Sequence, residues 1–216
     1  MEAILIGATG ATGKDLLKIL LADERYSSVK VFTRRPSGTR HPKLAEHLIE
    51  FGKPDSWAHL VKGDVLFSCL GTTLKLAGSK EAQYLVDYTY QYHFAKAARA
   101  NGVPAVALVS SGGADAQSAI FYLKMKGELE EAITQLGFNQ TMIFRPPLLI
   151  RKNSDRASEK WGRRILPLLN RLGLFKSQQP VTTDVLAQTM ANRAVDSTAG
   201  LHLYSGHYLS ELKSPN

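Results

Sequence analysis

Short runs of apolar residues alternate along this chain with longer segments in which apolar residues recur every three or four positions. The short runs end at glycine or proline, which is typical of buried parallel strands. The longer segments have the periodicity of amphipathic helices. The expected strands cover residues 3–6, 29–33, 46–51, 65–70, 103–109 and 140–144. The expected helices between them cover residues 12–21, 54–61, 79–100 and 118–136. This alternation predicts a parallel sheet with helices on both faces.

The pattern loosens after Pro147. We expect one or two basic amphipathic helices in residues 156–172, a helix over residues 182–193 and a last strand over residues 201–204. No internal repeat and no linker divides the chain.

The predicted fold class is therefore α/β, a Rossmann-type doubly wound parallel sheet with a small C-terminal helical region on the substrate side. One NAD(P)-binding domain would cover residues 1–216. Its cofactor-binding core would span about residues 1–147, and the substrate-side appendage about residues 148–216.

A glycine-rich loop, GATGATG, follows the first expected strand and opens the first expected helix. In such a loop one glycine permits a tight turn, one lets the backbone approach a pyrophosphate, and one lets helix and strand pack closely. Backbone N–H groups at the helix start then face the phosphate. We assign the close approach, with a positive φ, to Gly10. The expected cofactor contacts are Gly7, Thr9, Gly10, Ala11, Thr12 and Gly13.

The end of the second strand indicates which dinucleotide is bound. Sites specific for NAD place an acidic residue there to hold the ribose 2′-hydroxyl, but this chain has Thr33, Arg34 and Arg35. Guanidinium groups bind a 2′-phosphate through charge-assisted hydrogen bonds. We therefore expect NADP(H) rather than NAD(H), with Arg34 and Arg35 as cofactor contacts.

Candidate catalytic residues follow the fifth strand. Tyr122 and Lys126 are four residues apart, so on a helix they share one face. A neighbouring ammonium lowers the pKa of a phenol, which would make Tyr122 a proton donor and acceptor, and Lys126 could also bind the nicotinamide ribose. Ser110 and Ser111 stand at the expected carboxyl edge of the sheet, where either hydroxyl could hold a substrate carbonyl.

The glycine loop and the Tyr–Lys spacing resemble the short-chain dehydrogenase/reductase superfamily, in its extended and atypical branches. Further segments resemble one atypical branch, the oxidoreductases related to the HIV Tat-interacting protein and their bacterial counterparts. The matching segments are GATGATG (7–13), TRRP (33–36), CLGTT (69–73), AGSKEA (77–82), VDYT (86–89), SSGGA (110–114), YLKMKGELE (122–130) and FRPPLL (144–149).

The resemblance implies an NADP(H)-dependent oxidoreductase with a Ser–Tyr–Lys site, and it favours Ser110 over Ser111. It also implies that Leu70, Gly71 and Thr72 lie along the nicotinamide side. The remaining cofactor contacts that it suggests are Lys126, Arg145 and Pro146.

The chain departs from the superfamily on its fourth helix. Many members carry an asparagine there that helps a proton relay, whereas this chain reads Val86-Asp87-Tyr88, which puts the relay in doubt. Asp184 resembles an aspartate that ties loops together in extended members, so we expect a structural role for it.

Composition and charge exclude several classes of protein. With 44% hydrophobic residues the chain is not disordered, and we expect neither a secretory signal nor a membrane span. A cytoplasmic location is the expectation. The single cysteine, Cys69, permits no internal disulfide, and the histidines have no metal-ligand spacing. The net charge of +8 is scattered along the chain, so it suits a phosphate-bearing cofactor better than a nucleic acid.

Three functions remain open on these residues. The first is hydride transfer between NADP(H) and a small carbonyl substrate of unspecified identity. The second is a nucleotide-sugar epimerase-like reaction, for which about 70 residues after Pro147 make a lean substrate region. The third is a non-catalytic protein that senses NADP(H) or acts as a scaffold. A homodimer is compatible with all three.

Overall fold

The computed structural model describes residues 1–147, 149–150, 181–196 and 198–206. Seven parallel strands form one sheet in the order β3-β2-β1-β4-β5-β6-β9. These strands are β1 (Glu2–Ile6), β2 (Ser28–Thr33), β3 (Leu44–Leu48), β4 (Val65–Ser68), β5 (Ala105–Val109), β6 (Gln140–Arg145) and β9 (Gly200–Ser205). The order reverses between β1 and β4, and the first six strands follow the Rossmann arrangement. The predicted fold class is confirmed.

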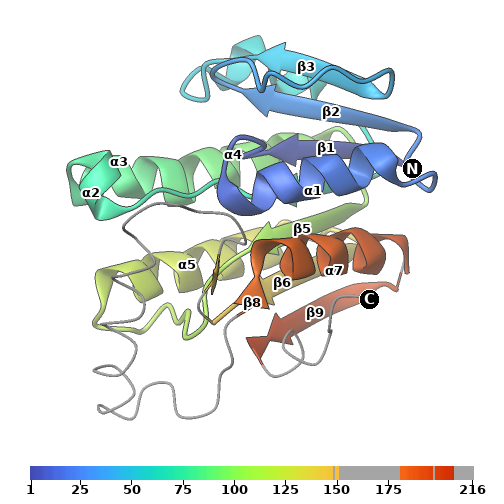
Figure 1. The fold of residues 1–216 in the computed structure, drawn as a ribbon. Coiled ribbons are helices and arrows are strands. Elements are labelled where there is room, and N and C mark those ends of the chain that lie inside the picture. Colours follow the sequence, from blue (N-terminus) through green and yellow to red (C-terminus); the bar gives the residue numbers. More distant parts are fainter. Residues whose placement is uncertain (148, 151–180, 197, 207–216) are drawn as a thin grey trace.

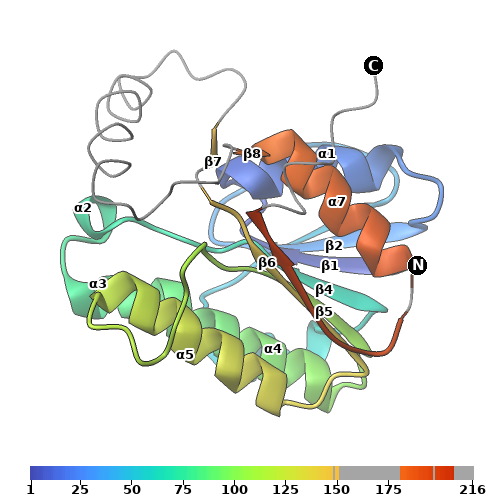
Figure 2. The ribbon, with the colours of Figure 1, turned by 90° about the horizontal axis from the view of Figure 1, so that it is seen from below.

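Helices cover both faces of this sheet (Figures 1 and 2). On one face lie α1 (Ala11–Ala22) and α7 (Thr183–Val195), which pack against each other. On the other lie α4 (Tyr90–Ala100) and α5 (Phe121–Gln135). Alternate residues of each strand face opposite sides, so β1 contributes Leu5 to the core under α1 and Ile4 to the core under α4.

The helix expected over residues 79–100 is one continuous helical segment with an irregular middle. It begins as α3 (Lys80–Tyr84), widens to a π-helical turn over Leu85–Thr89, and continues as α4. Ser79 caps it, because its Oγ accepts a hydrogen bond from Ala82 N at 3.1 Å. A short helix, α2 (Leu74–Ala77), precedes it and was not expected.

The third strand begins and ends earlier than the apolar run that predicted it, over Leu44–Leu48 instead of residues 46–51. It is an edge strand and needs no continuous apolar sequence. Phe51 leaves the strand and is buried beside Trp57 and Phe94, with ring-centroid distances of 6.5 and 6.2 Å. Phe51, the aromatic residue that ends that apolar run, therefore packs in the core beneath α4 and is not part of the strand. Two short 3-10 turns, Pro54–Ser56 and Ala58–Leu60, replace the helix expected over residues 54–61.

Two elements from the stretch expected as a substrate-side appendage belong to the sheet layers themselves. β9 pairs in parallel with β6 from Gln140↔Gly200 to Arg145↔Ser205, and α7 packs on α1. A separate two-stranded sheet joins β7 (Leu149–Ile150) to β8 (Val181–Thr182). The helices expected in residues 156–172 lie outside the described residues.

Candidate functional site

The glycine-rich loop joins β1 to α1 and has little room for side chains. Gly7 has a φ of +85°, and a Cβ there would lie 2.4 Å from the carbonyl carbon of Cys69. Gly10 caps α1 with a φ of −77°, so the positive φ expected at Gly10 belongs to Gly7 instead. No side chain caps the helix at Gly10. The first amide groups of α1 are therefore left for an anion, as a pyrophosphate requires.

A pocket of about 770 Å³ opens beside this loop, at the carboxyl ends of β1, β2 and β4. Parallel α/β sheets bind ligands at this edge, where the strand order reverses. Residues from the glycine loop, the end of β2, the loop after β4 and the helical segment line the pocket. They are Gly7, Thr9, Gly10, Phe32, Thr33, Arg34, Arg35, Pro36, Phe51, Cys69, Leu70, Gly71, Thr72, Leu76, Ala77, Ala82, Leu85, Val86 and Tyr90.

Three of the predicted loop contacts do not line this pocket: Ala11, Thr12 and Gly13. Thr12 is 6% exposed and belongs to the inner side of α1. Gly13 serves the packing of helix on strand, as a Cβ there would lie 2.1 Å from the carbonyl oxygen of Gly7. Gly7, Thr9 and Gly10 therefore make up the part of the loop that faces the pocket.

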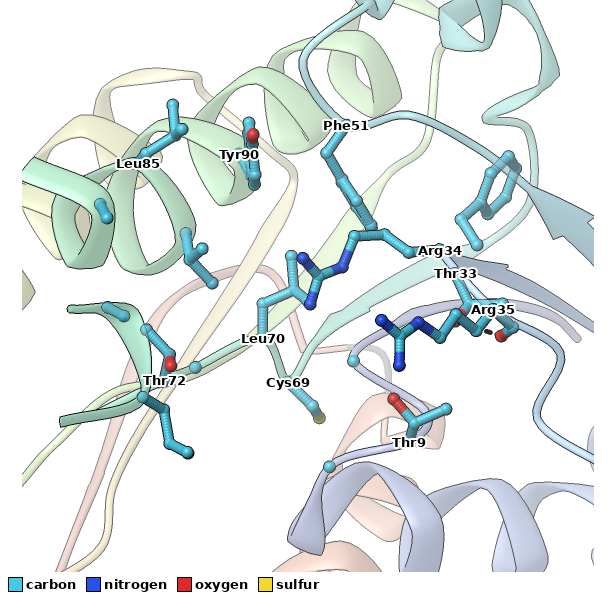
Figure 3. A pocket seen from close by; sticks show the side chains of 18 of the residues that line it. Thr9, Thr33, Arg34, Arg35, Phe51, Cys69, Leu70, Thr72, Leu85 and Tyr90 are labelled. Atoms are coloured by element: carbon cyan, nitrogen blue, oxygen red, sulfur yellow. Dashed lines mark hydrogen bonds between the residues drawn. The ribbon is translucent and has the colours of Figure 1, made fainter. Parts of the chain in front are cut away.

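Arg34 and Arg35 both reach into the pocket (Figure 3). The guanidinium of Arg35 points toward Thr9, and that of Arg34 points toward Leu70. Thr33 Oγ1 donates a hydrogen bond to the carbonyl oxygen of Arg35 at 2.9 Å, which fixes the turn after β2. Within the described part of the chain neither guanidinium has an ion-pair partner, so both positive charges are available to an anionic ligand.

Tyr122 and Lys126 stand one turn apart at the start of α5, as predicted. Lys126 is only 3% exposed, and its Nζ donates a hydrogen bond to the carbonyl oxygen of Val109 at 3.3 Å. Tyr122 is 37% exposed and interacts with the hydroxyl of Ser111. The end of β5 and the first turns of α5 thus bring the candidate catalytic groups together.

The two serines after β5 have different surroundings. Ser111 Oγ donates to the carbonyl oxygen of Gly112 at 3.3 Å. Ser110 is 5% exposed, and among the described residues its Oγ has no hydrogen-bond partner. A buried hydroxyl without a partner is costly unless a ligand or water satisfies it.

The pKa values of the pair differ from the expectation. Desolvation raises the pKa of Tyr122, the Asp87 carboxylate raises it further, and the Ser111 hydroxyl opposes them. The predicted lowering of this pKa by Lys126 is therefore wrong for the protein without cofactor. Burial lowers the pKa of Lys126, and the charges of Asp87 and Glu130 oppose that shift.

Arg145 and Pro146, suggested as cofactor contacts by resemblance, do not line the pocket. The Nε of Arg145 donates to both carboxylate oxygens of Glu130 at 3.0 Å. The carbonyl oxygen of Pro146 accepts from Gly112 N at 2.8 Å. The Arg145 side chain therefore joins the end of β6 to α5, and the Pro146 hydrogen bond joins the loop after β6 to the loop after β5.

Several residues around the site were not predicted. Phe51, Leu76 and Tyr90 form apolar walls of the pocket, and only the fold brings them there. Asp87 was noted as a departure from the superfamily and proves to be a buried neighbour of Lys126. Glu130 could have been found, because it follows Lys126 by four residues on the same helix face.

Two further features concern only the described residues. They contain no cluster of three or more histidine, cysteine, aspartate or glutamate side chains placed to hold a metal ion. None of their helices combines the length and the apolar character needed to cross a bilayer.

Asp184, expected to be structural, lies in the first turn of α7, where the neighbouring Thr183 Oγ1 donates to Asp15 Oδ2 on α1 at 2.6 Å.

The chain matches a family model described as NAD(P)H-binding over residues 7–163. Its sequence is 41% identical over 154 residues to "Protein FMP52, mitochondrial" of Meyerozyma guilliermondii, a match that covers 69% of this chain and 66% of the relative. It is 33% identical over 204 residues to "Protein FMP52-1, mitochondrial" of Scheffersomyces stipitis, covering 91% of this chain and 89% of the relative. Both relatives are named as mitochondrial proteins, which overturns the expectation of a cytoplasmic location.

Solved structures share the fold at lower identity. The oxidoreductase ylbE of Lactococcus lactis superposes with a TM-score of 0.71 at 18% identity, covering 98% of this chain and 96% of that one. A short-chain dehydrogenase/reductase superfamily protein from Agrobacterium tumefaciens with bound NAD gives 0.73 at 14%, covering 95% and 77%. The family match, the glycine loop and the pocket beside it agree, and the chain belongs to the NAD(P)H-binding family.

Proposed function

We propose that this protein is an NADP(H)-dependent oxidoreductase that transfers hydride to a small carbonyl substrate. The observation that carries the proposal is the convergence of two groups at one edge of the sheet. The glycine loop lines the pocket together with two arginines that have no ion-pair partner among the described residues. Ser110 follows β5, and Tyr122 and Lys126 lie at the start of α5, so the three residues lie at the same carboxyl edge of the sheet without lining the pocket. The Lys126 ammonium acts on the pocket residue Cys69.

The preference for NADP(H) follows from charge. Arg34 and Arg35 lie at the end of β2, where an acidic side chain would hold the ribose of NAD. A 2′-phosphate placed between two guanidiniums gains charge-assisted hydrogen bonds. NADH has no 2′-phosphate to pair with the two guanidiniums. On binding NADH they would therefore lose contact with water without gaining an anionic partner.

The residues around the carbonyl would divide the chemistry between them. NADPH, when bound, supplies the hydride that reduces the carbonyl carbon. The hydroxyl of Ser110 would hold the carbonyl oxygen, and Tyr122 would give its phenolic proton to that oxygen as the alcohol forms. The Lys126 ammonium would bind the ribose and favour the resulting phenolate. Ser110 is the better candidate for the carbonyl because its buried oxygen has no partner within the described residues.

Apolar side chains at the rim favour an apolar carbonyl substrate. Leu76 is 81% exposed and Leu85 is 42% exposed, and both line the pocket. Ile120 is 57% exposed and directly precedes α5, which carries Tyr122. Contact with an apolar substrate would remove these surfaces from water.

The proposal is tested by following NADPH consumption with a panel of aldehydes and ketones weighted to apolar members. We expect turnover with NADPH and little with NADH. Tight NADPH binding without turnover of any carbonyl would instead favour a sensing role. Conversion of a nucleotide sugar without net NADPH consumption would favour an epimerase. The Tyr122→Phe variant is the matched control, because it keeps the ring and removes the proton.

A further inference from the structure

Asp87 is a buried carboxylate that the chemistry above does not use. It is 1% exposed and lies in the π-helical turn between α3 and α4. Turns of this kind occur often at functional sites. The carbonyl oxygen of Asp87 accepts a hydrogen bond from Gln91 Nε2 at 2.7 Å, and Gln91 Oε1 accepts one from Ser68 Oγ at 2.7 Å. The widened turn is thus tied to the end of β4.

The carboxylate of Asp87 reaches the loop that follows β4. Thr72 N donates to Asp87 Oδ2 at 2.9 Å, and a Cβ at Gly71 would lie 3.5 Å from Asp87 Oδ1. Gly71 and Thr72 line the pocket, and Thr72 lies across it from Arg35 (Figure 3). The carboxylate therefore fastens the pocket wall that Gly71 and Thr72 form.

The charge of the same carboxylate also acts on the buried ammonium of Lys126, although no direct ion pair joins the two groups. The charged and titratable groups around Lys126 are Asp87 from the π turn, Glu130 from α5 and Cys69 from the loop after β4. Glu130 is already bound by the Arg145 guanidinium, which leaves Asp87 as the main anion for Lys126. Burial raises the pKa of Asp87 and lowers that of Lys126, and each charge opposes the shift of the other.

We propose that Asp87 is a positioning residue of the reducing site, whose one carboxylate fastens the Gly71–Thr72 loop and whose charge stabilises the buried ammonium of Lys126. The cofactor-side loop and the catalytic helix α5 are then coupled through a single group. The roles of the loop and of Lys126 rest on the proposed function. The contacts of Asp87 do not, so they can be tested without cofactor or turnover.

Two substitutions separate the two tasks of Asp87. Asp87→Asn keeps an oxygen that can accept from Thr72 N and removes the charge. Asp87→Ala removes both. Glu81→Gln is the matched control, since it removes an exposed carboxylate from the preceding helix α3. All three are compared with the wild-type protein in its full length.

The first measurement is a pH titration of Lys126 by NMR with isotope-labelled lysine, its signal assigned with a Lys126→Met variant. We expect Asp87→Asn to move the Lys126 titration midpoint to lower pH by about one unit or more. The reason is that burial lowers the pKa of Lys126, and the substitution removes a negative charge that opposes this effect. Glu81→Gln should leave the midpoint in place. An unchanged midpoint in Asp87→Asn would overturn the electrostatic half of the proposal.

The second measurement is hydrogen exchange at the Thr72 amide. Asp87→Ala should speed this exchange at least tenfold, and Asp87→Asn should restore most of the protection. Equal exchange in wild type and Asp87→Ala would show that the carboxylate does not fasten the loop. If neither Asp87 variant folds, the NMR chemical shift of the Thr72 amide in the wild-type protein is followed against pH, because it reports the titration of Asp87. Lys126→Met must then move the midpoint of the Asp87 titration to higher pH. An unchanged midpoint would overturn the proposal.

These outcomes are independent of the proposed function. Shifts in Lys126 and Thr72 in a protein that turns over no carbonyl would refute the reductase alone. Carbonyl turnover with no response of Lys126 or Thr72 to the Asp87 substitutions would refute the role of Asp87 alone.

Discussion

Gly13 faces the carbonyl oxygen of Gly7 so closely that a Cβ at residue 13 would lie 2.1 Å from it. No rotamer change can relieve this overlap, because both groups belong to the backbone. Gly10 lies in the same loop with a different constraint, since a Cβ there would lie 3.2 Å from Gly7 O and the residue is exposed. The two glycines therefore separate the packing of the loop from its binding of phosphate.

Gly13→Ala is expected to destabilise the fold by about 1–3 kcal/mol or more, as overpacking does. Gly10→Val is expected to fold, because its side chain can point into the pocket, and to lose both NADPH and NADH. Thermal unfolding followed by circular dichroism and cofactor titration by calorimetry measure these two effects. Normal cofactor binding by Gly10→Val would show that Gly10 does not approach the phosphate.

Removal of both Arg34 and Arg35 guanidiniums should weaken NADPH binding and leave NADH binding nearly unchanged. Each charged hydrogen bond is worth about 1.5–3 kcal/mol, so the Arg34→Ala, Arg35→Ala double variant should lose about 100-fold or more in affinity. Arg40→Ala is the control, because it removes an exposed arginine from the same loop outside the pocket. Equal losses for the two cofactors would contradict the assignment of the 2′-phosphate.

Tyr122→Phe should lower turnover by about 10²–10⁴-fold with NADPH affinity nearly intact, since a general acid contributes a factor of that size. Ser110→Ala should also lower turnover more than affinity, and Ser111→Ala should lower it less. Single-turnover kinetics on the best substrate of the carbonyl panel compare the three. A Tyr122→Phe enzyme with the wild-type rate would remove Tyr122 from the mechanism.

Glu130→Gln should destabilise the protein by about 1–3 kcal/mol, because it weakens a largely buried pair and leaves the Arg145 charge without its partner. The Glu130 side chain is 5% exposed and that of Arg145 is 28% exposed. Glu50→Gln breaks an exposed pair with Lys53 and should cost less than about 1 kcal/mol. Urea unfolding compares the two, and similar small losses would show that the Glu130–Arg145 pair contributes little to stability.

The sequence predicted the sheet because its strands are buried on both faces. Runs such as Val65–Phe67 have no solvent side, and their apolar character is unmistakable. The edge strand Leu44–Leu48 has no such signal, so its bounds were misplaced. The π turn at Leu85–Thr89 leaves the helical periodicity nearly unchanged. Its tertiary contacts, from Thr72 to Asp87 and from Ser68 to Gln91, join residues too far apart in the sequence for a local pattern to reveal.

The candidate site was predicted where one segment supplies it. The glycine loop and the arginine pair each follow a strand directly, and the pocket is lined by both arginines and by Gly7, Thr9 and Gly10, but not by the other three predicted loop residues. The environment of Tyr122 was not predicted, because Asp87 reaches it from another helical segment. Local spacing predicted that Lys126 shares a helix with Tyr122, as it does in α5. It could not show that the Asp87 carboxylate, distant in sequence, acts on both residues.

Cys69 gives a final test, because it lines the pocket and is the only cysteine in the chain. Burial raises the pKa of its thiol from 9.0 to about 12, with the Lys126 charge opposing. The thiolate is the nucleophile, so at pH 8 its fraction falls by about 10³ relative to an ordinary cysteine. Iodoacetamide should therefore alkylate Cys69 about 10³-fold more slowly in the folded protein than in the urea-unfolded chain.

The pH dependence of that alkylation separates ionisation from simple shielding. A shielded thiol of ordinary pKa would reach a constant rate above about pH 9, whereas the raised pKa predicts a rate that still rises tenfold per pH unit at pH 10. Lys126→Met removes the opposing cation and should slow the reaction further at pH values where Lys126 is protonated. Saturating NADPH should slow it as well, because Cys69 would then be covered. A plateau near pH 9, or equal rates in the folded and unfolded protein, would show that the thiol ionises normally.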